Sequence, residues 1–373
     1  MVGVTGAGSQ KSPHPGSQSF PRPYSFGMSS RDVAREGSTT TTGSAHASLM
    51  DIIKVKPIQV VPRESKDSHA RTSTSMDIFV GKSHAAGRFT THVYGGQLVG
   101  QALMAAATTV MDTERTLHSM HCHFLQAGSH NEPFVFTVDR LRDGATYSSR
   151  FVVARQAGAA IFTAMCSFQQ LHEYSDTNAL QHQSTMPANV PPPESLPDQR
   201  ETLLDAIRNA RLSEEDKIRL KDSVDSLPPF PVDIRVVQPI QRIGPDSVKP
   251  REPRQLAWIR LPSTPGCDAQ VAEATVKASL AYASDWGFLE TAALPHGINL
   301  ANRRLKMSSL DHTLYFHHKP RAGEWLLFEM ESGSASGGRA LATGRIYRRD
   351  GGQLVATVVQ EGLMRIQRNQ SKL

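Results

Sequence analysis

The sequence predicts an α+β protein formed by an internal duplication, with two antiparallel sheets joined edge to edge and each wrapped round its own helix. Two observations predict this architecture. Each half contains a largely apolar helix and a meander of strand-like runs separated by Gly-containing turns. The halves also repeat at an offset of 192 residues, so that "NEPFVF" at 131 aligns with "GEWLLF" at 323, and "RRDGG" occupies the position of "RQAGA".

The first repeat is predicted to span residues 48–170, beginning with "SLMDIIKVKPIQVV". Its helix, 93–111, carries Gly96, Gly100 and Ala107 on one face. Glycine weakens a helix by roughly 1 kcal/mol relative to alanine, so this face predicts close approach by other backbone. The strand-like runs of this repeat are 76–83, 117–126, 133–142, 146–156 and 159–170.

The second repeat is predicted over residues 232–366, after a Pro-rich and charged linker over 171–231. The linker contains a charged amphipathic stretch that predicts a surface helix or a pair of helices. The helix of the second repeat is 277–294, and its strand-like runs are 232–240, 254–261, 310–320, 324–331, 338–349 and 353–365. Residues 1–47 are rich in Ser, Thr, Gly and Pro and are expected to be disordered, and 367–373 form a polar tail.

Composition argues against several classes of protein. The net charge is +6, but the basic residues are scattered, so nucleic-acid binding is not predicted. No apolar run approaches the roughly 20 residues that span a bilayer, and no secretory signal is expected. The cysteines show no CxxC spacing and predict neither a disulfide framework nor a zinc site: Cys122, Cys166 and Cys267.

One residue of the predicted helix 277–294 breaks its pattern. Asp285 falls on the same face as the apolar residues Ala278, Ala281, Phe288 and Leu289. A buried carboxylate costs several kcal/mol unless it has partners. From the residues alone, Asp285 is read as a structural acid capped by a neighbouring strand, and a catalytic acid is the open alternative.

Other reactive side chains give weaker patterns. His118, His121 and His123 lie close together, but no carboxylate or cysteine stands at ligand spacing on their face, so no metal site is predicted. Cys122 and Cys166 have no recognisable triad context. The sequence contains no G-x-S-x-G motif, which argues against an α/β-hydrolase.

Six motifs in both halves carry a resemblance to a known family: "YGGQLVGQAL", "HSMHCHFLQAG", "LRDGATYSSRFVVARQ", "YASDWGFL", "SSLDHTLYFHH" and "VVQEGLMR". They resemble the acyl-CoA thioesterase II family. The resemblance implies a double hotdog fold and hydrolysis of fatty acyl-CoA thioesters to fatty acid and coenzyme A, without a cofactor. It also implies a catalytic trio of Asp285, Ser309 and Gln360 around a water.

These residue types suit hydrolysis of a thioester. Of the three, only Asp285 can act as a general base, whereas Ser309 and Gln360 can fix a water by hydrogen bonds. The family spacing favours Ser309 over Ser308, and Asp311 is the competing acid. The oxyanion would be met by backbone N–H groups at a helix start such as Tyr94–Gln97, or at the counterpart of that start before Asp285.

The substrate's other parts are expected to meet side chains from both repeats. Coenzyme A phosphates would be met by Arg142, Arg150, Arg303 or Arg304, for each of which a solvated charge is the equal alternative. The acyl chain would occupy an apolar tunnel along a buried helix, beside Leu98, Leu103, Trp286 and Phe288.

The final tripeptide, Ser371-Lys372-Leu373, matches the signal read by the peroxisomal import receptor. The expected location is therefore the peroxisomal matrix, and a homo-oligomer is compatible with the family. Three other functions stay open: an acyl-CoA-binding protein without catalysis, a hydratase acting on enoyl-CoA, and a thioesterase for a branched, dicarboxylic or polyketide acyl-CoA.

Overall fold

The computed structural model describes residues 47–60, 76–84, 92–110, 112, 114–170, 180–210, 212–225, 230–238, 249–263, 269–298 and 305–367. They lie in the compact unit His46–Leu373. The predicted disordered segment falls outside the described residues except for its last position, and the tripeptide 371–373 lies outside them too. Within the described part, no helix is long and apolar enough to cross a membrane.

The described strands form one antiparallel sheet in which the two predicted repeats are continuous. The first repeat supplies β1 (Val55–Gln59), β2 (Met76–Gly81), β3 (Arg115–Phe124), β4 (Phe134–Asp143), β5 (Tyr147–Gln156) and β6 (Ala159–Gln170). The second supplies β7 (Asp233–Val236), β8 (Arg254–Arg260), β9 (Leu305–Ser309), β10 (Asp311–Phe316), β11 (Trp325–Ser336), β12 (Arg339–Arg348) and β13 (Leu354–Ile366).

The repeats join where β3 pairs with β10. His123 pairs with Asp311, and Ser119 pairs with Tyr315. The sheet of the first repeat is therefore hydrogen-bonded directly to the sheet of the second. The strand order is β1-β2-β4-β5-β6-β3-β10-β13-β12-β11-β8-β7, and β9 adds to β13. The predicted edge-to-edge joining of two meanders is confirmed.

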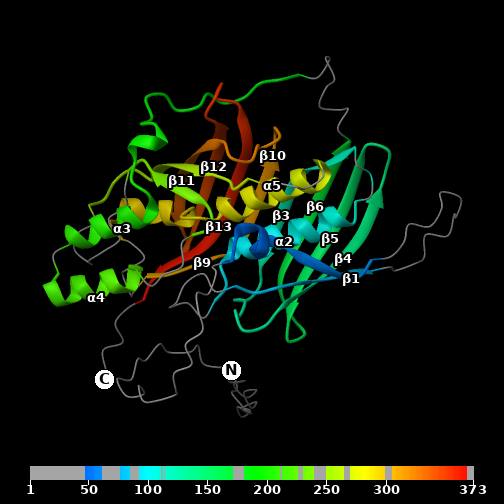
Figure 1. Cartoon of the computed structure of the whole chain (residues 1–373), viewed down its shortest axis with the longest axis horizontal. Coiled ribbons are helices and arrows are strands. Elements are labelled where there is room, and N and C mark those ends of the chain that lie inside the picture. Colours follow the sequence, from blue (N-terminus) through cyan, green and yellow to red (C-terminus); the bar gives the residue numbers. More distant parts are fainter. Residues whose placement is uncertain are drawn as a thin grey trace, which may run out of the picture. The chain divides into compact units, whose positions relative to one another are not determined.

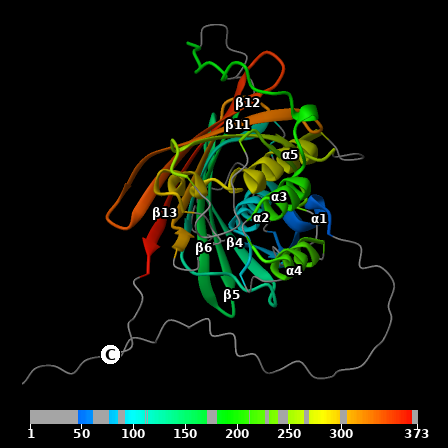
Figure 2. The same cartoon turned by 90° about the vertical axis from the view of Figure 1, so that its left-hand side faces the viewer.

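Two helices cover one face of this sheet (Figure 1). Helix α2 (Gly95–Thr108) belongs to the first repeat and α5 (Ala269–Ser284) to the second, and they pack against each other. The short helix α1 (Leu49–Ile53) lies beside both (Figure 2). The core between helices and sheet is continuous across the repeats, which makes one hydrophobic unit rather than two.

The glycines of α2 are where the two helices touch. A Cβ on Gly96 would lie 2.3 Å from the carbonyl oxygen of Tyr282, and a Cβ on Gly100 would lie 3.1 Å from that of Ala278. No larger residue fits at Gly96 without a shift of backbone. The close approach predicted from the small face of this helix is confirmed, and the approaching backbone is that of α5.

Helix α5 ends earlier than predicted. The expected helix 277–294 stops at Ser284, and a turn leads into the 3-10 helix η3 (Leu289–His296). Gly287 sits in the turn with φ of 63°, a left-handed conformation that ends α-helices and favours glycine. Asp285 therefore stands in the turn after the helix, not on its apolar face.

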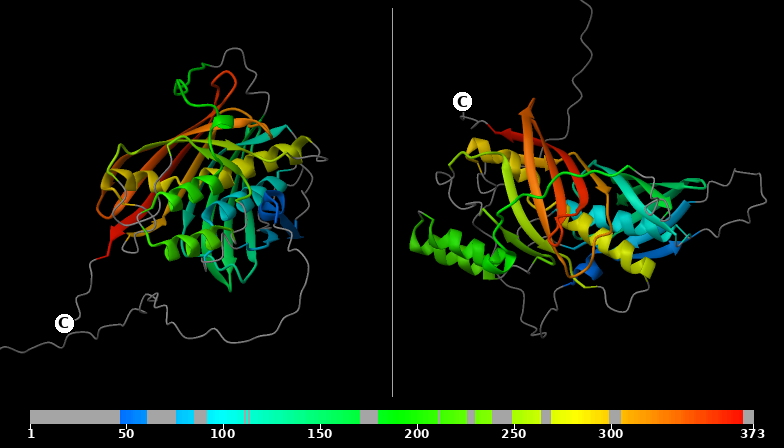
Figure 3. Two further views of the ribbon diagram at one scale, coloured as in Figure 1. Left: turned by 60° about the vertical axis from the view of Figure 1, so that its left-hand side comes forward. Right: turned by 90° about the horizontal axis from the view of Figure 1, so that it is seen from above.

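The predicted linker is fastened to the second repeat. It contains the short 3-10 helix η2 (Pro193–Ser195) and the helices α3 (Gln199–Arg208) and α4 (Glu214–Asp225), which form a pair (Figure 3). Before them, the Gln183 side chain bonds the backbone of Leu354 and Gly352, at 3.0 and 2.9 Å. Trp258 Nε1 donates to the Pro191 carbonyl at 2.8 Å. These contacts hold the segment along β8, β12 and β13.

A buried polar cluster links α5 to the first repeat. Lys277 is 3% exposed and donates to Thr116 and to the Leu117 carbonyl on β3. Thr116 in turn donates to Glu273, which also receives Lys319 at 2.6 Å. Burial would raise the pKa of Glu273, but the two ammonium groups and the hydroxyl lower it to about 2.

Candidate active site

Three residues predicted as a trio lie together at the end of α5. Asp285 follows the helix, Ser309 is the last residue of β9, and Gln360 lies on β13. Gln360 Nε2 donates to Asp285 Oδ1 and to Ser309 Oγ, both at 2.8 Å. Gln360 is fully buried, whereas Asp285 and Ser309 are half-buried and can be reached from outside.

The first repeat supplies a fourth contact that the sequence reasoning did not assign. The backbone N–H of Gly96, at the start of α2, donates to Asp285 Oδ2 at 2.9 Å. The amino end of a helix carries partial positive charge, and this contact directs it at the Asp285 side chain. The site therefore spans both repeats and does not belong to the second alone.

This contact occupies one of the N–H groups that were expected to meet the oxyanion. Within Tyr94–Gln97, the N–H of Gly96 is bonded to Asp285, and the N–H of Gln97 is bonded to the Tyr94 carbonyl at 3.0 Å. Neither is available to an oxyanion in this arrangement. The amino end of α2 acts here on the carboxylate instead.

Two features hold the start of α2 against α5: a hydrogen bond from the Tyr94 side chain, and glycines that leave room for close approach. Tyr94 Oη donates to the Tyr282 carbonyl at 2.9 Å. Burial first, and then the charge of Asp285, raise the pKa of Tyr94 well above its usual value, so the phenol keeps its proton. A Cβ on Gly95 would come within 2.9 Å of Asp285 Oδ2, so glycine is needed there as well. The glycine pair in "YGG" is the sequence signal for this contact.

An open pocket of about 130 Å³ gives access to the trio. We call it the near pocket; its walls include Asp285, Phe288, Leu289, Met307, Ser309 and Gln360. Besides the trio, its walls carry the polar residues Glu290 and Ser308 and the apolar residues Phe288, Leu289 and Met307. Such a mixture suits a ligand with one reactive polar centre and a hydrocarbon part.

The neighbouring candidates take other positions. Ser308 is exposed, and the bond from Gln360 goes to Ser309. Asp311 Oδ1 accepts the N–H of Glu361 at 2.7 Å, so that carboxylate fastens the break between β9 and β10 to β13.

His312 is a further residue that the sequence reasoning did not assign. It is fully buried, and its Nε2 lies 2.9 Å from Ser284 Oγ. Burial lowers the pKa of His312, so the ring is neutral, and it supports the residue just before Asp285. The "SSLDH" motif was the only signal for it, because a buried His has no pattern of its own.

Among the described residues, the thiols and the histidines form no second reactive centre. Cys122 and Cys166 are buried, and burial raises the pKa of Cys166 to about 12 and that of Cys122 well above its usual value. Neither is poised as a thiolate nucleophile. Among the described residues, no group of three His, Cys, Asp or Glu side chains could hold a metal ion.

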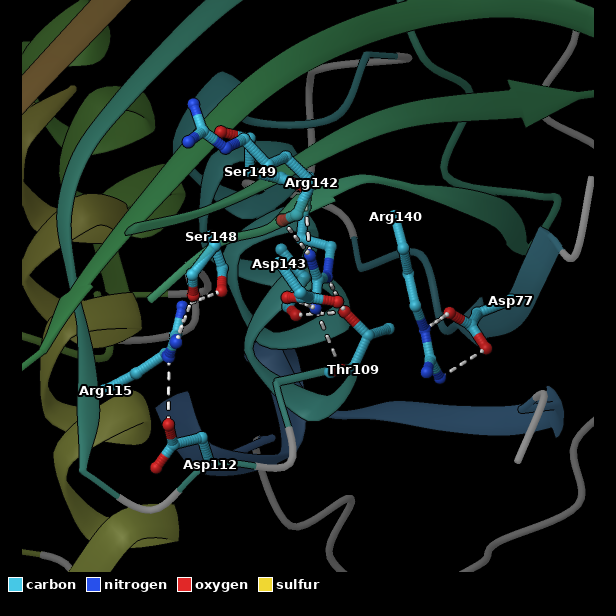
Figure 4. A network of polar contacts seen from close by, with 12 residues as sticks. Asp77, Thr109, Asp112, Arg115, Arg140, Arg142, Asp143, Ser148 and Ser149 are labelled. Carbon is cyan, nitrogen blue, oxygen red and sulfur yellow. Dashed lines mark hydrogen bonds and ion pairs between the residues drawn. The ribbon is translucent and has the colours of Figure 1, made fainter. Parts of the chain in front are cut away.

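Arg150 is not placed to meet coenzyme A, contrary to the expectation. Its side chain is 1% exposed, with Nε donating to Thr109 Oγ1 and Nη2 to Asp143 Oδ1, both at 2.8 Å. This network lies at the end of α2, the position that corresponds to the end of α5, and Figure 4 shows the polar side chains that fill it. The first repeat therefore has a buried arginine, paired with the exposed Asp143, where the second has its open pocket. Arg303 and Arg304 lie outside the described residues.

The expected acyl tunnel along a helix is only partly matched. Leu98, Leu103 and Trp286 are packed in the shared core and do not line the near pocket, whereas Phe288 does. A continuous antiparallel sheet made of two helix-and-meander repeats, with one polar site between the ends of their helices, defines the class as a double hotdog.

Comparison with known proteins places the chain within this class. Residues 85–169 match the acyl-CoA thioesterase N-terminal domain, and residues 215–364 match the acyl-CoA thioesterase C-terminal domain. Human acyl-coenzyme A thioesterase 8 is 39% identical over 288 residues, covering 75% of this chain and 83% of the human protein. Peroxisomal acyl-coenzyme A thioester hydrolase 1 of Saccharomyces cerevisiae is 27% identical over 308 residues, covering 72% and 84%.

A solved structure agrees. The crystal structure of the acyl-CoA thioesterase II TesB2 from Mycobacterium marinum is 32% identical and superposes with a TM-score of 0.59, covering 86% of this chain and 98% of that one. The chain belongs to the acyl-CoA thioesterase II family.

Proposed function

We propose that this protein hydrolyses fatty acyl-CoA thioesters to free fatty acid and coenzyme A, with Asp285 as the general base for a water held by Ser309 and Gln360. Family membership supports the reaction class. The observation that carries the mechanism is the convergence of the three side chains, with Gln360 bonded to both of the others at 2.8 Å.

Asp285 has the hydrogen-bonding capacity that a base needs. Each of its carboxylate oxygens accepts one bond from the protein, from Gln360 and from Gly96. An ionised carboxylate offers about four acceptor positions, so lone pairs remain for a water. The two bonds fix the carboxylate in place and leave it able to take a proton.

The reaction then follows from these contacts. The water oxygen attacks the thioester carbonyl carbon and passes one proton to Asp285. The tetrahedral intermediate collapses, the carbon–sulfur bond breaks, and the coenzyme A thiolate leaves and takes the proton back from Asp285. The products are a carboxylic acid and a thiol, and Asp285 returns to its ionised form.

Ser309 and Gln360 have different tasks. Gln360 uses Nε2 on Asp285 and Ser309, so it positions both. Ser309 Oγ accepts from Gln360, so its own O–H proton is left to donate to the water or to the thioester oxygen. This arrangement holds the water near the carbonyl carbon, where orientation contributes to the rate.

The test is thiol release from palmitoyl-CoA, with crotonyl-CoA assayed in parallel. We expect Asp285→Asn to bind acyl-CoA but to lose between about a hundred- and ten-thousand-fold in kcat, the usual contribution of a general base. Asp311→Asn removes the competing acid in the same way and serves as the matched control, with a much smaller loss. A larger loss of kcat in Asp311→Asn than in Asp285→Asn would assign the role of general base to Asp311.

The same assay separates the alternatives. Binding of palmitoyl-CoA without thiol release by the wild type would indicate a protein that has lost catalysis. Consumption of crotonyl-CoA without thiol release would indicate a hydratase. A panel of branched and dicarboxylic acyl-CoA substrates tests for a specialised pathway.

We also propose that the protein acts in the peroxisome. The yeast relative is named as peroxisomal, and the sequence carries Ser371-Lys372-Leu373, which matches the import signal. A fluorescent protein fused to the amino end should mark peroxisomes, and deletion of the tripeptide should leave it in the cytosol. Unchanged peroxisomal labelling after the deletion would show that the tripeptide is not the import signal.

A further inference from the structure

A second, larger pocket lies beyond the near pocket on the same elements. This far pocket has a volume of about 200 Å³, and its walls include Ala293, Leu305, Ala335, Arg339, Met364 and Ile366. Most of these side chains are apolar, and Ile366 is 41% exposed, which is unusual for an isoleucine on a folded domain. No step of the proposed mechanism uses this pocket.

The two pockets follow one another along the same elements, η3, β9 and β13. On β9, Ser309, Met307 and Leu305 alternate onto the same inward face, and they pair with Gly362, Met364 and Ile366 on β13. Helix η3 covers this face, with Leu289 at the near pocket and Ala293 at the far pocket. We call the path from one pocket to the other, between η3 and the β9–β13 pair, the groove.

An apolar cluster lies where the two pockets approach each other: Leu289, Ala292 and Ala340 are buried in it, and Met307 and Met364 pack against them. Met307 lines the near pocket and Met364 lines the far pocket, and the two residues face each other directly across β9 and β13. Both pack with Leu289 in a small apolar cluster. Leu289 can lie there because position 362 is glycine: a Cβ on Gly362 would be 2.1 Å from Leu289 Cδ2.

This methionine pair, Met307 and Met364, is suited to move. Both residues are only partly buried, and methionine is unbranched and adapts its shape to its surroundings. A hydrocarbon chain entering from the near pocket would replace contacts between the two side chains with equally apolar contacts of its own. The groove can thus open without breaking a hydrogen bond.

We propose that the acyl chain of the substrate runs along the inner face of β9 and β13 from the near pocket into the far pocket, and that the methionine pair determines which chain lengths are accepted. This inference rests on the proposed function, because it needs the thioester carbonyl at Asp285. It assigns the acyl chain to a different path from the tunnel along the buried helix that the sequence suggested.

The geometry of β9 gives the length of acyl chain that the groove can hold. Four residues separate Ser309 from Leu305, which is about 13 Å at roughly 3.3 Å per residue. An extended chain advances roughly 1.2 Å per bond, so about ten or eleven carbons reach the end of the groove. The methionine pair lies halfway, so acyl chains of about six carbons or fewer stop before it.

The experiment measures kcat/KM by thiol release for butanoyl-, hexanoyl-, dodecanoyl- and hexadecanoyl-CoA. Met364→Ala should raise the ratio of dodecanoyl to hexanoyl kcat/KM by roughly tenfold, the lower end of what one methylene contributes in an apolar pocket. Ala335→Trp, which narrows the far pocket, should lower the same ratio by a similar factor.

Matched controls come from the same sheet. Met165→Ala removes an exposed methionine on β6, and Ser334→Trp adds the same ring beside Ala335 on β11 but outside the pocket. Both should keep the wild-type ratio. Ratios that stay within about twofold of wild type in folded Met364→Ala and Ala335→Trp, with thiol release intact, would overturn the groove while leaving the proposed function standing. A wild type that releases no thiol from any of the four substrates would overturn the proposed function and the groove with it.

Discussion

The contact between α2 and Asp285 makes Gly96→Ala the most informative substitution in this fold. The new Cβ would lie 2.3 Å from the Tyr282 carbonyl oxygen, whereas real Cβ contacts do not fall below 3.0 Å. The start of α2 must therefore retreat by about 0.7 Å. A retreat of that size takes the bond between Gly96 N–H and Asp285, now 2.9 Å, to the limit at which it is lost.

The size of the effect follows from that bond. A hydrogen bond to a charged group contributes about 1.5 to 3 kcal/mol, which is about ten- to a hundred-fold in kcat/KM if it acts in the transition state. Extra volume in a packed contact should also reduce the free energy of unfolding by about 1 to 3 kcal/mol. The assay is thiol release at a temperature where the variant is fully folded, checked by thermal unfolding.

Gly100→Ala is the control within the same helix. Its Cβ would be 3.0 Å from Ile53 Cγ2 and 3.1 Å from the Ala278 carbonyl, which strains the packing but does not touch Asp285. It should reduce stability and leave kcat/KM within about twofold of wild type. Wild-type kcat/KM in folded Gly96→Ala, or an equal loss in Gly100→Ala, would refute the role assigned to the start of α2.

Three further predictions concern stability. The folded-state pKa of Glu273 is about 2, below its usual 4.5, so its contribution is present above pH 4.5 and is lost as the pH falls toward 2. In urea unfolding, the difference between wild type and Glu273→Gln should shrink by about 3 kcal/mol over that range, and a constant difference would contradict this. Arg150→Met removes the hydrogen bonds of a buried guanidinium to Thr109 and Asp143, so it should lower the free energy of unfolding by about 1 to 3 kcal/mol while the folded enzyme keeps its kcat/KM; a loss of kcat/KM at unchanged stability would contradict this. Gly158→Ala, at a turn with φ of 82° and open space around the Cβ, should cost about 1 kcal/mol, and a stabilised variant would show that the turn has another conformation.

The repeats and their turns were predictable because their signals are local. The turn at Ala157 and Gly158 and the matching one at Gly351 and Gly352 all have positive φ, as "QAG" and "RDGG" between apolar runs indicate. The edge-to-edge joining of the two sheets also followed from the duplication, whereas the strands that form the junction, β3 and β10, were not predicted. The ends of the predicted strands differ by a few residues, with β11 extended furthest, but β1 and β9 were not predicted as strands.

The site was predictable only through the resemblance. The residues alone gave an acid at an odd position. The helix was extended too far because apolar residues at helical spacing continue past Gly287, through Phe288, Leu289 and Ala292, although the left-handed Gly287 ends it. The bond from Gly96 depends on how closely α2 and α5 pack, a distance that spacing does not reveal. Arg150 was predicted to meet coenzyme A because an arginine is usually exposed. Its burial depends on its partners Thr109 and Asp143, which lie on other elements, so the local sequence does not indicate it.

The central claim is that Asp285 acts on a water and does not itself attack the thioester. The direct measurement is a single turnover with enzyme in excess in water enriched in oxygen-18, followed by mass spectrometry of the fatty acid and of the peptide that contains Asp285. We expect the heavy oxygen in the fatty acid and none in the peptide. Heavy oxygen in Asp285, or a fatty acid without it, would show that the carboxylate formed an anhydride and would contradict the role of base.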